Sequence, residues 1–303
     1  MLIIEFCCIL LVNLGKKNDL SQHLRYILLI NLAMLCISTS GALGRYIELP
    51  PPLTIWFRAG FAFLFLGAFC LYQKYKIKFD PRKYGFTIII TGILMTVHWV
   101  TYFYALQWSN VAVAMLSLFT YPMITTLLEP IFLKTKLNPI HVASGIFILI
   151  GIYFLVPDFD MNNGMTQGLL MGILSSVCYA IRNLILKTQI RSFNGSVLMF
   201  YQMAVMLLVL FPVVFLYDFS FSEVQRDLPY IIFLGLITTA VGHTLFLNSF
   251  KYFSATSASI MSSVQPIFGI LMAMLFLSEF PDYRSMIGGG VIMLVVILNG
   301  LKK

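Results

Sequence analysis

The sequence predicts an all-α integral membrane protein with ten transmembrane helices, arranged as two inverted five-helix repeats. Three observations support this class: an apolar composition, ten apolar segments separated by clear breaks, and a similarity between the two halves of the chain. Of the 303 residues, 59% are hydrophobic and only 11% are charged, against about 25% in an ordinary soluble domain. A soluble fold needs more charged residues than this on its surface. A disordered chain is excluded because such chains are poor in aromatic residues, and this one contains 27 phenylalanines.

The predicted spans follow one another with short connections and are close to the length of about 20 residues that crosses a bilayer. Proline ends the first span at Pro50–Pro52, and Ser109-Asn110 makes a tight turn after the third. Continuous apolar runs without alternation of period two predict helices rather than barrel strands. The ten segments are 26–46, 53–72, 85–105, 111–133, 139–156, 166–187, 195–216, 228–248, 254–278 and 282–300.

Residues 1–22 are interpreted as an N-terminal extension, followed by five-helix repeats at 23–157 and 166–301. The apolar stretch 1–15 is short for a span, contains Glu5 and lacks the basic start of a signal peptide. It is either an interfacial extension or the result of an early start codon, and no function is assigned to it.

The distribution of basic residues predicts the orientation of the spans. With the N-terminus inside, only Arg45, Arg226 and Arg284 fall in outer loops, while Arg58 and Arg182 lie within spans. All other basic residues fall on the inner side: Lys16, Lys17, Arg25, Lys74, Lys76, Lys78, Arg82, Lys83, Lys134, Lys136, Lys187, Arg191, Lys251, Lys302 and Lys303. Because basic residues collect on the cytoplasmic side, we expect a multi-pass protein of the cell (inner) membrane with both termini cytoplasmic. The net charge of +8 is thereby explained without nucleic acid.

The two halves of the chain resemble each other at a shift of 144 residues, which pairs Pro122 with Pro266, Ala114 with Ala258 and Gly145 with Gly289. Because five spans are an odd number, the second half must be inserted upside down. Inverted repeats are typical of transporters.

The second half resembles the C-terminal part of an EamA domain of the drug/metabolite transporter superfamily. Ser254-Ala255-Thr256 open the ninth span, Pro266-Ile267-Phe268 lie inside it, Glu279 ends it, and a glycine-rich tenth span follows. Arg58 stands where the family places an arginine in the second span, whereas Thr135 occupies the position equivalent to Glu279. The resemblance covers roughly residues 26–300, in two copies.

The resemblance implies a carrier of small organic metabolites, often an exporter, that works by alternating access. The leading expectation is that it carries amino acids or related metabolites. Transport is driven by a gradient or is facilitative. One alternative is an importer or exchanger, such as a sugar-conjugate carrier. Another is a non-transporting membrane subunit or sensor, against which the repeat and the polar residues in mid-span argue.

Polar residues in mid-span are the candidates for a substrate path, because unpaired polar groups are costly in lipid. His98 and His243 lie one residue apart in the repeat register. Each either binds substrate, carries a proton, or is a neutral histidine that hydrogen-bonds to a neighbouring helix. Trp99 and Tyr102 share a helical face and either stack on a solute or pack. Asn248 is a further polar residue of the eighth span.

Pro122 and Pro266 each remove a backbone hydrogen bond inside a span. The freed carbonyl can face a cavity and the kink can act as a hinge; the alternative is a static kink. Tyr121 and Gln265 precede them as expected ligands.

Arg182, with Asn183 beside it, either snorkels to the cytoplasmic surface or forms an anion site near the inner mouth. In the repeat register it matches Ser38, which makes both stretches candidates for the path. For Arg58 we expect a structural pair or a lipid-headgroup contact, and for Glu279 a cap or a pair.

No enzyme motif is present: there is no GxSxG, P-loop, HExxH or pair of carboxylates at useful spacing. No cofactor and no metal are expected, and the five cysteines form no CxxC. The expected partners are a small organic metabolite, the bilayer and, through a histidine, protons; the oligomeric state is left open.

Overall fold

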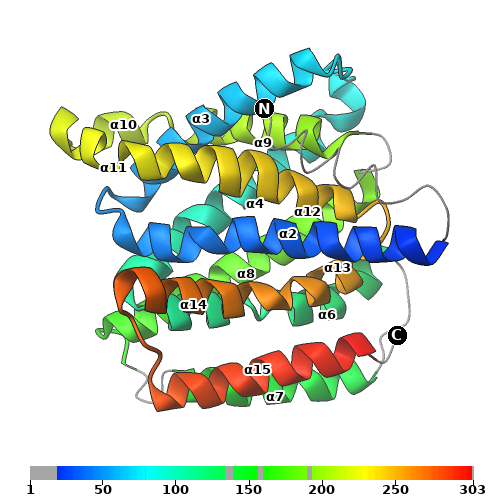
Figure 1. Ribbon diagram of the computed structural model, residues 1–303, viewed down its shortest axis with the longest axis vertical. Helices are drawn as coiled ribbons and strands as arrows, with labels where there is room; N and C mark the ends of the chain where they lie inside the picture. The colour runs from blue at the N-terminus through cyan, green and yellow to red at the C-terminus, as the bar shows by residue number, and fades with distance from the viewer. Residues whose placement is uncertain (1–18, 79, 134–138, 156–159, 190–192, 302–303) are drawn as a thin grey trace.

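The computed structural model describes residues 19–78, 80–133, 139–155, 160–189 and 193–301, and the regular structure in these ranges is helical (Figure 1). The predicted extension 1–22 lies outside them except for 19–22, which open the first helix. The elements are α2 (Asp19–Tyr46), α3 (Pro51–Tyr72), α4 (Pro81–Trp108), α5 (Val111–Leu118), α6 (Tyr121–Leu133), α7 (Pro139–Leu155), α8 (Gly164–Gln189), α9 (Gly195–Leu210), α10 (Val213–Leu216), α11 (Phe221–Phe233), the π-helical η1 (Leu234–His243), α12 (Thr244–Ser249), α13 (Ala255–Met261), the 3-10 turn η2 (Ser262–Val264), α14 (Gln265–Leu277) and α15 (Tyr283–Leu301).

Short polar side chains and prolines set the starts of several helices. Asp80 accepts a hydrogen bond from Arg82 N at 3.0 Å ahead of α4, and Asn110 accepts one from Val113 N at 2.8 Å ahead of α5. Such caps bind N–H groups that have no partner within the helix. The breaks predicted from the sequence are therefore real helix boundaries.

Eight helical segments in the described part of the chain are long and apolar enough to cross a bilayer. They are Arg25–Tyr46, Pro51–Tyr72, Pro81–Trp108, Val111–Phe132, Gly164–Thr188, Gly195–Leu216, Phe221–Ser249 and Ala255–Leu277, and two shorter apolar helices cover Ile146–Leu155 and Tyr283–Val295. The multi-pass architecture predicted from composition is present.

The helices lie roughly side by side, so that the bundle has two ends (Figure 1). We call them the Tyr46 end, where α2 finishes and α3 begins, and the Tyr72 end, where α3 finishes. Gly164, the first residue of α8, packs against the backbone of Trp108 at the Tyr46 end. Lys187, near the other terminus of α8, donates to the Phe253 carbonyl at 2.6 Å at the Tyr72 end. Helices α2 and α8 therefore run in opposite directions.

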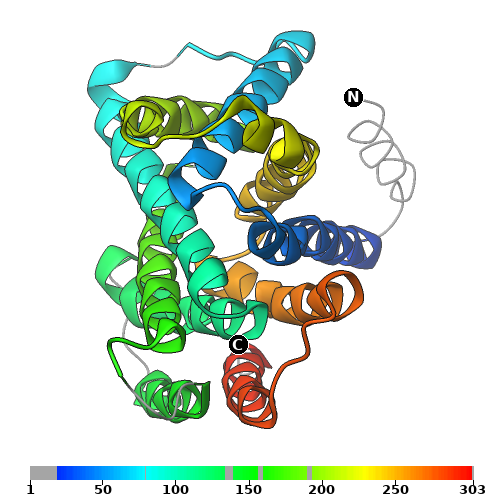
Figure 2. The same cartoon turned by 90° about the vertical axis from the view of Figure 1, so that its left-hand side faces the viewer.

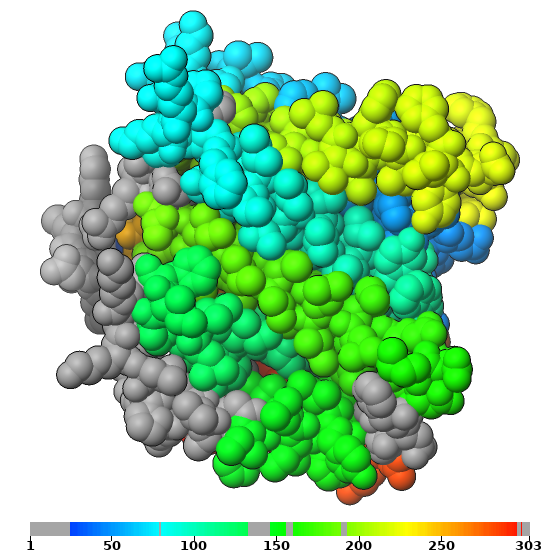
Figure 3. Space-filling model, turned by 180° about the vertical axis from the view of Figure 1, so that it is seen from behind, coloured from blue at the N-terminus to red at the C-terminus, as the bar shows by residue number. Residues whose placement is uncertain are grey.

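Figure 2 shows the bundle from the Tyr46 end. Helices α7 and α15 lie side by side on one flank, α3 and α9 lie on the opposite flank, and α2, α4, α8 and α14 fill the middle. Figure 3 shows α8 alongside α4 on the far side of the molecule. Polar side chains in mid-span on the middle helices thus meet away from the surface.

Two predicted spans are interrupted in the middle. The sequence predicts continuous helices over 111–133 and 254–278, but α5 ends before α6 begins at Tyr121, and α13 and η2 precede α14. Pro122 and Pro266 each take the second position of the following helix, where the missing N–H has no partner to lose. Each proline starts a new helix instead of kinking a continuous one.

The same boundaries recur in both halves of the chain. Helices α5 and α13 begin at Val111 and Ala255, and α6 and α14 begin at Tyr121 and Gln265, each pair 144 residues apart. Helices α7 and α15, which begin at Pro139 and Tyr283, keep this spacing. The weak similarity between the halves therefore reflects a structural repeat.

Candidate functional site

A buried chamber lies where the interrupted segments meet α3, α4 and α8. Its volume of about 10 Å³ is near the smallest that holds one water molecule, so the chamber is closed. It is lined by Ile37, Ser40, Arg58, His98, Trp99, Tyr102, Leu118, Phe119, Tyr121, Tyr179, His243 and Gln265. Six of the residues singled out from the sequence line it together: His98, Trp99, Tyr102, Tyr121, His243 and Gln265.

His98 is held firmly by α8. Its Nδ1 lies 2.7 Å from Ser175 Oγ, and that hydroxyl donates to the His98 carbonyl at 2.8 Å. The imidazole also stacks on Tyr179 at a ring distance of 4.3 Å. His98 is thus bonded to a neighbouring helix, as in one of the alternatives that the sequence left open.

His243 is bound less completely. Its ring lies 5.2 Å from that of Trp99, the residue that matches it in the repeat register, and its buried Nδ1 has no hydrogen-bond partner. Tyr102 likewise buries a hydroxyl without a partner. Buried polar atoms are normally paired, so these two side chains keep capacity for a solute or a proton.

The interrupted segments contact each other at the chamber. The Tyr121 hydroxyl hydrogen-bonds to the Ser262 hydroxyl, which joins the start of α6 to η2. Ser38 donates to the Gln265 carbonyl at 3.1 Å and so joins α2 to the start of α14. Pro122 and Pro266 directly follow the two chamber residues Tyr121 and Gln265 in the sequence. Movement at either interruption would therefore move chamber walls.

Arg182 does not snorkel to the surface: its exposed fraction is 0%. It donates to Asn183 Oδ1 at 2.9 Å and to Gln202 Oε1 at 2.5 Å, and its guanidinium lies 5.8 Å from the Tyr179 ring. Arg182 and Asn183 therefore lie behind the chamber, between α8 and α9.

Asn248 lies apart from the chamber. Its Oδ1 accepts a hydrogen bond from Gly195 N at 3.2 Å, at the start of α9. It lines a separate pocket of about 90 Å³ towards the Tyr72 end. The structure thus does not bring this predicted path residue together with the others.

Arg58 is the main chamber residue that sequence reasoning assigned differently, to a structural pair or a lipid headgroup. Its exposed fraction is 1%, its guanidinium lies 3.8 Å from the Trp99 ring centroid, and Nε donates to Thr239 at 2.8 Å. Tyr179 and Ser175 were also missed. The charge of Arg58 within a predicted span could have identified it as a chamber residue. Tyr179 gave no such signal, because tyrosines and other aromatic residues are common throughout this chain.

A vestibule of about 700 Å³ opens at the Tyr46 end. Arg45 faces Glu279 across it at 3.7 Å, and Glu279 also accepts a hydrogen bond from Val111 N at 2.8 Å, so it both pairs and caps as expected. The vestibule is lined by Arg45, Tyr46, Glu48, Asn110, Arg226, Asp227, Leu277, Ser278 and Glu279.

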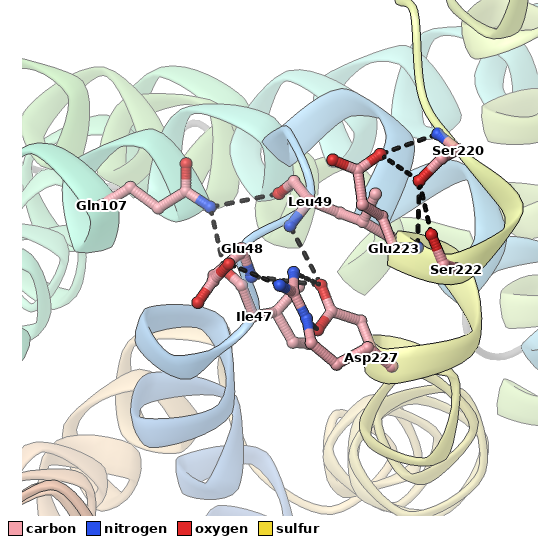
Figure 4. Close-up of polar contacts among 9 residues, drawn as sticks. Ile47, Glu48, Leu49, Gln107, Ser220, Ser222, Glu223 and Asp227 are labelled. Atoms are coloured by element: carbon pink, nitrogen blue, oxygen red, sulfur yellow. Dashed lines mark hydrogen bonds and ion pairs between the residues drawn. The ribbon is translucent and has the colours of Figure 1, made fainter.

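The connection from α2 to α3 is clamped beside this vestibule (Figure 4). Asp227 accepts hydrogen bonds from the backbone N–H groups of Glu48 and Leu49 at 3.1 and 3.0 Å. From the other side, Gln107 donates to the carbonyls of Ile47 and Leu49, both at 3.2 Å. The loop is therefore fixed between α4 and α11.

Comparison with known proteins places this arrangement in context. The profile described as the EamA-like transporter family matches residues 24–156 and again residues 166–301. An uncharacterized transporter of Bacillus subtilis, YxxF, is 24% identical over 277 residues, which cover 89% of this chain and 86% of that protein. The pseudopaline exporter CntI of Pseudomonas aeruginosa is 22% identical and covers 91% of this chain, with 96% of its own length matched. A protein of known crystal structure matches this chain with a TM-score of 0.69 and 18% sequence identity. The match covers 91% of this chain and 96% of that protein chain, so the two have the same fold.

Proposed function

This chain belongs to the EamA-like transporter family, and we propose that it is a secondary carrier that moves small organic metabolites across the cell membrane by alternating access. Energy comes from a gradient, with protons carried through a histidine, or transport is facilitative. In the leading form of this proposal, the direction of transport is export and the substrates are amino acids or related metabolites. A relative of similar length is named for the export of pseudopaline, which supports export here.

One observation carries the proposal: polar groups without partners surround a closed chamber between two interrupted helices. Arg58 Nη2, Tyr102 Oη and His243 Nδ1 are buried there without hydrogen-bond partners. Such groups are costly in a membrane and mark solute pathways, and paired interrupted helices are typical of transporter binding sites. A scaffold protein needs neither feature.

We further propose ten spans in two inverted repeats, at 23–157 and 166–301 after an extension at 1–22. In this proposal α7 and α15 are the fifth and tenth spans, although they are shorter than the other eight. The opposite directions of α2 and α8, and the spacing of 144 residues between helix starts, support it. Two inversely oriented halves can exchange states open to either side.

The test is transport by the purified protein in liposomes, screened with labelled metabolites with and without a pH gradient. The expected result is saturable flux of at least one organic class, above that of empty liposomes. A variant with both chamber contacts of the interrupted helices changed, Tyr121→Phe with Gln265→Leu, is expected to lower this flux. The exposed change Asp218→Asn serves as its control.

The direction of flux separates the alternatives. Release from loaded liposomes without a counter-solute supports an exporter or a uniporter, whereas flux that requires solute on both sides identifies an exchanger. No flux of any class by a folded protein would contradict the carrier proposal and favour a sensor or subunit.

A further inference from the structure

Two arginines are buried in the centre of the protein without an acidic partner. Arg58 and Arg182 are 1% and 0% exposed, and a guanidinium stays charged. Their hydrogen bonds go to neutral groups: Thr239 for Arg58, and Asn183 and Gln202 for Arg182. Among the residues that the structure describes, neither of these arginines forms an ion pair, whereas Arg45 and Arg226 at the Tyr46 end do. Two positive charges in the interior are therefore uncompensated.

The same region has an excess of hydrogen-bond donors. Arg58 Nη2, Arg182 Nε, Asn183 Nδ2 and Gln202 Nε2 are all buried without a partner. A buried charge without a partner destabilises the protein, and each buried donor without a hydrogen bond destabilises it further. An anion that accepts hydrogen bonds from these groups offsets both costs.

The repeat places one arginine in each half of the molecule. Arg58 on α3 matches Gln202 on α9, and Ser38 on α2 matches Arg182 on α8, each at the spacing of 144 residues. Arg58 lies two turns from the start of α3 at the Tyr46 end, and Gln202, bonded to Arg182, lies two turns from the start of α9 at the Tyr72 end. The arginines therefore approach the chamber from opposite ends.

Each guanidinium lies near an aromatic residue that lines the chamber. Arg58, itself a lining residue, lies 3.8 Å from the ring centroid of Trp99, and Arg182, behind the chamber wall, lies 5.8 Å from that of Tyr179. Stacking on Trp99 fixes the plane of the Arg58 guanidinium and leaves its edge for a carboxylate or phosphate.

Resting on the proposed transport function, we propose that the carried solute is a small organic dianion with two acidic groups, carboxylate or phosphate. Arg58 binds one group and Arg182 binds the other when the chamber opens. The chamber lining contains no aspartate or glutamate among the described residues, so the ammonium of a zwitterion would lack a charged partner. Of the amino-acid-related metabolites, those with two acidic groups and no ammonium match these charges.

A binding experiment on the detergent-purified full chain tests this without transport. The chain has three tryptophans, and the double variant Trp56→Phe, Trp108→Phe leaves Trp99 as a fluorescent reporter in the chamber. Titration with succinate and with glycerol 3-phosphate is expected to change Trp99 fluorescence saturably. Dimethyl succinate, which lacks the charges, and zwitterionic alanine are expected to have no effect.

The arginines are tested in the same background. Arg182→Gln is expected to weaken succinate binding at least about tenfold, because it removes one charge without touching the contact of Arg58 with Trp99. Arg284→Gln, at an exposed position, is the matched control and should bind as the parent does. If Arg182→Gln does not fold, the comparison of the diacid with its ester still decides.

The outcomes separate this proposal from the transport function. A response to alanine or to the ester equal to that of succinate overturns the dianion proposal, as does flux of zwitterions or neutral sugars without flux of dianions. A Trp99 response to dianions with no flux in liposomes supports the anion site and contradicts transport.

Discussion

Single side chains at the Tyr46 end hold together segments that are distant in the sequence. Asp227 is 1% exposed, yet it accepts two backbone hydrogen bonds from the loop between α2 and α3 and pairs with Arg226 at 3.0 Å. The Asp227 carboxylate thus accepts hydrogen bonds from three residues, and loss of its charge leaves those donors more weakly bound.

Asp227→Asn is therefore expected to lower the free energy of unfolding by about 1–3 kcal/mol. Denaturant unfolding in detergent, followed by circular dichroism, measures the change. Asp218→Asn, also towards the Tyr46 end but exposed, should stay within about 0.5 kcal/mol of the parent. Equal effects of the two changes would show that Asp227 does not clamp the loop.

The two central histidines are expected to differ in role, because only one is fully bound. His243→Gln should remove the pH dependence of flux, since His243 lines the chamber and its buried Nδ1 has no hydrogen-bond partner. His98→Gln should reduce the amount of folded protein but keep the pH dependence, since His98 binds Ser175. Flux into liposomes over a pH series measures both, and an unaltered profile in His243→Gln rules out this proton route.

At the scale of helices, glycine allows α7 and α15 to pack closely. A side-chain carbon on Gly288 of α15 would lie 2.5 Å from the backbone oxygen of Gly151 on α7. Backbone cannot move aside as a flexible side chain does, and small residues are what allow membrane helices to approach so closely.

Gly288→Ala is expected to push α7 and α15 apart and to destabilise the protein by about 1–3 kcal/mol. Gly290→Ala is the matched control, because no atom lies within 4 Å of the added carbon. The loss is measured as a lower midpoint of thermal unfolding in detergent. If both variants unfold at the parental temperature, these helices do not depend on each other.

The helices were largely predictable from sequence, whereas the site was predictable only in part. Apolar runs bounded by prolines and caps determine where a helix begins, so starts such as Val111 and Pro139 were found locally. The position of Arg58 depends on Thr239 and Trp99, which belong to other helices. Asn248 shows the converse, since a polar residue in mid-span turned to cap another helix.

The whole molecule is closed at its centre and hollow at one end. The vestibule of about 700 Å³ at the Tyr46 end contrasts with about 10 Å³ in the chamber. In the proposed carrier, entry of a solute would require the two repeats to separate. The clamped loop and the pair of Arg45 with Glu279 lie where that separation would begin at the Tyr46 end.

The orientation of this end is testable by labelling. In a background in which the five cysteines are replaced by serine, Ser278→Cys, in the vestibule, is expected to react with an impermeant maleimide added to intact cells. Thr188→Cys, exposed near the Tyr72 end, should react only after the cells are opened. The reverse pattern would place the vestibule in the cytoplasm.

The contact of Trp99 with His243 at 5.2 Å joins two residues that occupy the same position in the two repeats. One position of the repeat thus presents an indole from one half of the chain and an imidazole from the other. In the proposed carrier, solute that arrives from opposite faces of the membrane would meet different chemistry, so the two half-saturation concentrations need not be equal. Detailed balance still applies: in a passive carrier, any tighter binding on one face must be matched by slower turnover from that face, and the asymmetry changes the kinetics without creating a gradient.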